Sequence, residues 1–67
     1  MPLRLVRLTN ECGNKIDMNA DLLMEILAGK NAKGQDGTYV LLSGYAKARW
    51  VYEQPESVRM AFEKALK

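Results

Sequence analysis

The chain has 67 residues, a formal net charge of +2, one cysteine and no histidine. A lone cysteine excludes an intrachain disulfide, and the missing histidine removes the usual general base of enzymes and a principal zinc ligand. The length and composition predict one domain, residues 1–67, that is not an enzyme and has no catalytic, cofactor or metal site.

The first part of the chain predicts a β-hairpin. Residues 3–8 are rich in strand-forming side chains, residues 10–14 supply asparagine and glycine for a turn, and residues 15–18 alternate polar and apolar side chains. In the first strand, Leu3 and Leu5 are expected on one side and Val6 and Leu8 on the other.

Segment 20–28 is consistent with either a short helix or a strand. Four of its apolar residues share one helical face, and Asn19 and Gly29 suit the start and the end of a helix. A strand over residues 23–28 stays open as well, because tertiary context routinely overrides local propensity.

The next region predicts a second hairpin. Residues 30–37 are polar and include two glycines, which is typical of a mobile loop. Residues 38–42 predict a strand, and residues 45–52 are expected to return as its partner. We expect Trp50 and Tyr52 of the returning strand to pack under the C-terminal helix, with the neighbouring lysine and arginine in solvent on the other face.

The C-terminal segment predicts an amphipathic helix. Pro55 suits a first helical turn, and Glu56 complements the helix dipole there. The apolar side chains recur at helical spacing, whereas Met60 falls on the polar face. The predicted fold is therefore α+β: a small antiparallel sheet of four to five strands with the C-terminal helix packed on one face.

Two motifs resemble a known family. One is Asn19-Ala20-Asp21-Leu22, after a glycine turn, and the other is Val51-x-Glu53-x-Pro55-Glu56, before the terminal helix. Their order along nearly the whole chain resembles the FlbD-type small flagellar motility proteins. The resemblance implies an accessory role in motility through protein–protein contact, and a strand at residues 23–28.

Two further resemblances give alternative functions. Similar short patterns resemble small phage or prophage proteins, which implies inhibition of a host protein by binding. The layout of a basic first strand, a glycine turn, a central strand pair and a terminal helix resembles the CsrA-type regulators, which implies a dimeric RNA-binding protein. We do not favour nucleic-acid binding, because the positive charge is not concentrated in one segment.

The predicted partner is another protein, with a homo-oligomer also expected, because open sheet edges invite pairing and one helix cannot cover both faces. No apolar run reaches the ~20 residues of a membrane span, so no membrane insertion is expected. The lone thiol and the lack of an export signal predict a cytoplasmic location. The candidate partner-binding residues are Leu3, Leu5, Arg7, Lys47, Arg49 and Met60.

Overall fold

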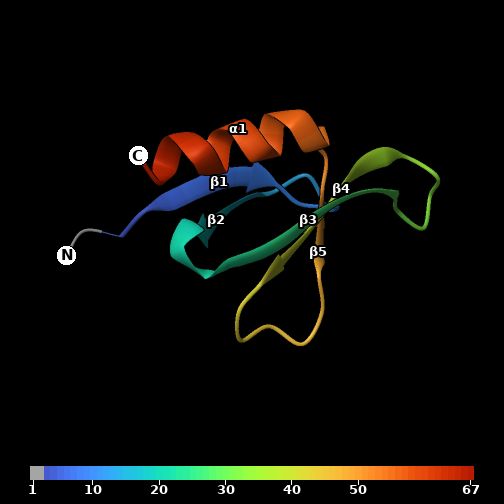
Figure 1. Ribbon diagram of the computed structural model, residues 1–67. Helices are drawn as coiled ribbons and strands as arrows, with labels where there is room; N and C mark the ends of the chain where they lie inside the picture. Colours follow the sequence, from blue (N-terminus) through green and yellow to red (C-terminus); the bar gives the residue numbers. More distant parts are fainter. Residues whose placement is uncertain (1–2) are drawn as a thin grey trace.

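The computed structural model describes residues 3–67 and has an α+β fold, as the sequence predicts (Figure 1). Its elements, in chain order, are β1 (Leu5–Thr9), β2 (Lys15–Asn19), the 3-10 helix η1 (Ala20–Leu22), β3 (Leu23–Lys30), β4 (Asp36–Leu42), β5 (Arg49–Val51) and the helix α1 (Pro55–Ala65). Within the described residues, no helix is long and apolar enough to cross a membrane.

The strands form two antiparallel sheets, whereas the sequence pattern predicted one sheet. β1 and β2 make a two-stranded sheet, and the other three strands make a second sheet in the order β3-β4-β5. The short helix η1 redirects the chain between the sheets, and the Asn19 side chain caps it by accepting a hydrogen bond from the Asp21 N–H at 3.0 Å. An isolated bridge between Asn10 and Val51 connects the two sheets.

Segment 20–28 is a 3-10 turn followed by a strand, so the helical alternative is wrong. Asn19 does act as a helix cap, but η1 has only three residues before β3 begins. From Glu25 to Lys30, β3 pairs in register with β4. This pairing supplies long-range hydrogen bonds that the local helical pattern does not reveal.

Two predicted boundaries of the second hairpin also need correction. The loop is shorter than the predicted 30–37, because β3 continues to Lys30 and β4 begins at Asp36. The returning strand is only Arg49–Val51, not residues 45–52, because the chain turns at Gly44, with φ +87°, and bends before β5. The shorter strand leaves the preceding basic and aromatic side chains outside the sheet.

The core lies between α1 and the two sheets, with Phe62 and Val58 of the helix fully buried in it. Val51, not Trp50, faces this core, so the predicted packing of Trp50 and Tyr52 under the helix is wrong. Trp50 is paired with Tyr39 on the opposite face of the sheet, whereas Val51 is paired with the buried Thr38. The buried core residues are Val6, Leu8, Met18, Ala20, Val40, Leu42, Val51, Val58 and Phe62.

Candidate functional site

The six predicted partner-binding residues fall into separate groups. Leu3, Leu5 and Met60 are exposed apolar side chains, with 70%, 49% and 60% of their surface accessible. Leu5 and Arg7 line a groove between β1 and α1, and Met60 lies in a hollow that adjoins it. The predicted cations of the β4–β5 connection lie elsewhere: Arg49 lines a different hollow, beside β2, and Lys47 is exposed.

On the strand side, Leu5, Val6 and Arg7 line this β1–α1 groove, next to the edge of β1 that faces away from β2. At the end of the strand, the Thr9 carbonyl accepts a hydrogen bond from the Tyr52 N–H at 2.9 Å, so Thr9 points its main-chain groups away from β2. In an antiparallel pair the main-chain groups of successive residues alternate in direction. The N–H and C=O groups of Leu5 and Arg7 therefore also face away from β2. β1 pairs with β2 alone within the described residues.

Glu53 covers the same edge at Thr9. Its carboxylate accepts hydrogen bonds from the Thr9 N–H, at 2.9 and 3.1 Å, and from the Thr9 hydroxyl at 3.0 Å. The Thr38 hydroxyl donates to the Glu53 carbonyl at 2.7 Å, which connects this contact to the second sheet. The chain then leaves β1, because α1 begins at Pro55. Within residues 3–67, the edge is thus covered at Thr9 and has no strand partner at Leu5–Arg7.

The wall of the groove is one side of α1. Figure 1 shows α1 lying along β1 and running in the opposite direction. The helix contributes Ala61, Lys64 and Ala65 to a groove of about 290 Å³. The two alanines are one helical turn apart, and their short side chains leave space between the helix and the strand edge. The groove therefore joins open main-chain groups to a wall of small side chains.

A wider hollow continues from the groove over the outer surface of α1. It has a volume of about 760 Å³ and shares Ala61 and Lys64 with the groove. Met60 lies in this hollow, and most of its surface is accessible. The groove and the hollow together form one surface that combines apolar side chains with lysines.

The cations around the groove differ in their ion pairing. Arg7 donates a hydrogen bond from Nε to the Asp17 carboxylate at 3.0 Å. This bond, together with the attraction between the two charges, raises the pKa of the Arg7 guanidinium above its usual value. Arg4 lies 3.6 Å from Asp21. Within residues 3–67, Lys64 has no carboxylate within ion-pair distance. Lys64 is therefore the cation of the groove that is available to a partner.

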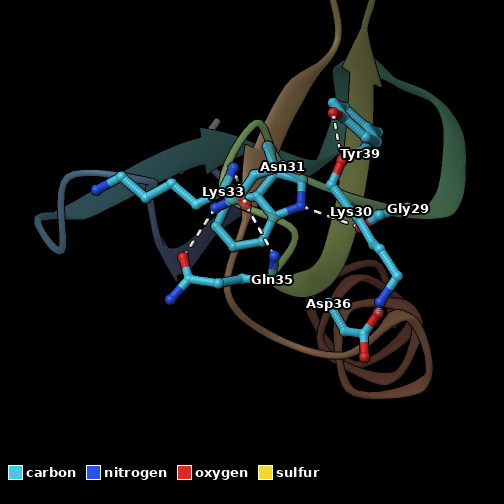
Figure 2. A network of polar contacts seen from close by, with 8 residues as sticks. Gly29, Lys30, Asn31, Lys33, Gln35, Asp36 and Tyr39 are labelled. Atoms are coloured by element: carbon cyan, nitrogen blue, oxygen red, sulfur yellow. Dashed lines mark hydrogen bonds and ion pairs between the residues drawn. The ribbon is translucent and has the colours of Figure 1, made fainter.

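The Trp50 indole on the outer face of the second sheet is buried. Trp50 is only 8% exposed and donates a hydrogen bond from its indole to the Gly29 carbonyl at 3.1 Å. Figure 2 shows the adjacent network, in which the Asn31 side chain accepts hydrogen bonds from the N–H groups of Lys33 and Gln35. The buried indole is not accessible for stacking against a base.

Sequence reasoning missed the helical wall of the groove and a second set of exposed apolar side chains. Ala61 and Ala65 belong to the predicted apolar stripe of the helix, so the pattern alone assigned them to the core. Met24 and Leu27 on β3 are 65% and 53% exposed, although a helical reading placed Leu27 on the buried face. Either set can be found only from the tertiary structure, because it depends on where the strand edges lie relative to the helix.

Comparison of the chain with protein-family models, with curated proteins and with solved structures finds no match. Within the part of the chain that the structure describes, no group of three or more His, Cys, Asp or Glu side chains is placed to hold a metal ion. The geometry of the groove is therefore the basis for a functional proposal.

Proposed function

We propose that this protein is a non-enzymatic accessory protein that acts by binding another protein through the β1–α1 groove. The observation that carries the proposal is the open edge of β1 at Leu5–Arg7 beside a wall of small side chains on α1. Exposed strand edges are a common site for adding a segment of another chain. The motifs around Asn19 and Pro55 resemble FlbD-type proteins, which supports a role in flagellar motility.

Protein binding has more support than RNA binding. Arg4 and Arg7 of the first strand are already paired with aspartates, and the Trp50 indole is buried. Arg49 lies over the Tyr45 ring at 5.6 Å, and Lys47 near it in the chain is exposed. We expect purified protein to be free of nucleic acid by its ultraviolet absorbance ratio. A phage-type inhibitor would use the same groove on a host protein.

The proposal is tested by complementation in a bacterium that carries the gene. We expect deletion of the gene to reduce swimming in soft agar, and the unaltered chain to restore it. The variant Leu5→Lys with Met60→Lys alters two exposed residues of the groove surface and is expected not to restore swimming. Both sites are exposed, so each change is expected to alter the free energy of unfolding by no more than about 0.5 kcal/mol.

The matched control is Met24→Lys with Leu27→Lys, which makes the same kind of change at exposed residues of β3. This control is expected to restore swimming fully. Normal swimming of the deletion strain would contradict the flagellar role. Full restoration by the groove variant would contradict the groove as the binding surface.

A further inference from the structure

We propose that the β1–α1 groove binds an extended, acidic segment of its partner, which adds to the edge of β1 as a new strand with a carboxylate beside Lys64. This inference rests on the proposed function and specifies the chemistry of the partner. Its three supports are the direction of the main-chain groups on β1, the size of the groove and the charge around it.

The chain itself shows how a segment pairs with this edge. Tyr52 donates its N–H to the Thr9 carbonyl, and the Glu53 carboxylate accepts from the Thr9 N–H. Pro55 then begins α1, so this cover does not extend to the part of the β1 edge that precedes Thr9 in the chain. A partner strand at Leu5–Arg7 would continue the same line of hydrogen bonds. It would run antiparallel to β1, as the chain at Tyr52 does. Carboxylate recognition by a main-chain N–H already occurs at this edge.

The size of the groove favours an extended segment over a helix. Neighbouring strands lie about 4.8 Å apart, so a strand beside β1 needs little space. A helix with its side chains is about 10 Å wide. The groove has a volume of about 290 Å³, and its wall consists largely of Ala61 and Ala65. These dimensions suit a few residues of extended chain.

The charge around the groove favours an acidic segment. The groove and the adjoining hollow together are lined by Lys64 and Lys67 and by Arg7, whose charge Asp17 offsets, against Glu63 as the acidic side chain among the lining residues. A second copy of this chain is a poor occupant, because its own Lys64 would enter the same positive surface. Like charges placed close together disfavour association. The observations therefore favour a foreign acidic segment.

The probe is a fluorescein-labelled octapeptide of alternating threonine and glutamate, and the matched probe replaces each glutamate with glutamine. Threonine favours extended chain in both peptides. By fluorescence anisotropy we expect the glutamate peptide to bind about fivefold more tightly, the effect of about one exposed ion pair. In NMR titrations the amide signals of Leu5 and Arg7 are expected to shift, because their N–H groups receive the new hydrogen bonds.

Two variants test the role of the lysine. Lys64→Gln is expected to remove most of the preference for glutamate while leaving binding of the glutamine peptide unchanged. Lys33→Gln changes an exposed lysine of the β3–β4 loop in the same way and is expected to keep the preference (Figure 2). Loss of the preference in both variants would contradict a specific role for Lys64 and overturn the acidic contact.

The remaining outcomes also distinguish the inference from the function on which it rests. Equal binding of both peptides, with shifts at Leu5 and Arg7, overturns the acidic preference and leaves the proposed function standing. If the peptide shifts amide signals along β3 in place of β1, strand addition at this edge is overturned.

If the Leu5 and Arg7 amide signals shift when the protein concentration is raised in the absence of peptide, a second copy is the occupant and the foreign segment is overturned. No binding of either peptide at a protein concentration of about 1 mM overturns strand addition. The complementation assay tests the function separately.

Discussion

Phe62→Ala is expected to lower the free energy of unfolding by about 3–5 kcal/mol, the usual cost of removing a buried phenylalanine side chain. Phe62 is 1% exposed and packs in the cluster that α1 shares with both sheets. A domain of this size has a total stability of about 3–5 kcal/mol from its core. We therefore expect the variant to be largely unfolded at room temperature in a urea titration followed by circular dichroism.

The control for Phe62 is Met60→Ala on the same helix. Met60 is 60% exposed, so its truncation is expected to change the unfolding free energy by no more than about 0.5 kcal/mol. Equal destabilisation by the two substitutions would contradict the placement of the helix, because it would mean that Phe62 contributes no more to the core than an exposed side chain does.

Gly37→Ala is expected to lower the free energy of unfolding by about 3 kcal/mol, at the upper end of the cost of overpacking. Gly37 lies in β4 against β5, where an added Cβ atom would overlap the Trp50 ring and the Val51 carbonyl oxygen. The carbonyl belongs to the main chain of β5, so the clash is relieved only if the strands move apart. Urea unfolding followed by tryptophan fluorescence measures the loss directly, because Trp50 is the only tryptophan.

Gly29→Ala is the matched control in the neighbouring strand. Its added Cβ atom would meet only the Tyr39 ring, at 2.7 and 2.8 Å, and that side chain can rotate away. We expect a loss of about 1 kcal/mol, at the lower end of the same range. If the two alanine variants were equally stable, the close approach of β5 to Gly37 would be contradicted.

Patterns within short segments predicted several elements correctly. The helix follows from Pro55 and the apolar spacing after it, and the first hairpin follows from strand formers on both sides of a glycine turn. The exposure of Leu5 and Met60 also follows from alternation and helical phase. In each of these cases the deciding interactions lie within a few residues in sequence.

Features that depend on pairing were not predictable from the sequence. A helix cap at Asn19 is equally consistent with a long helix and with the three-residue turn that the structure has. The prediction placed Trp50 on the wrong face because it was based on alternation alone, without the register that pairs Val51 with the buried Thr38. The helical wall of the groove depends on where α1 crosses β1. The expected homo-oligomer stays a prediction, for which the terminal strand β3 offers a second edge.

Amide hydrogen exchange at β1, followed by NMR on the unaltered chain at low concentration under reducing conditions, tests whether the edge of β1 beside α1 is open for a partner. We expect the Leu5 and Arg7 amides to exchange much faster than those of Val6 and Leu8, which face β2. Equal, strong protection of all four amides would contradict this expectation, because the edge would then already be covered.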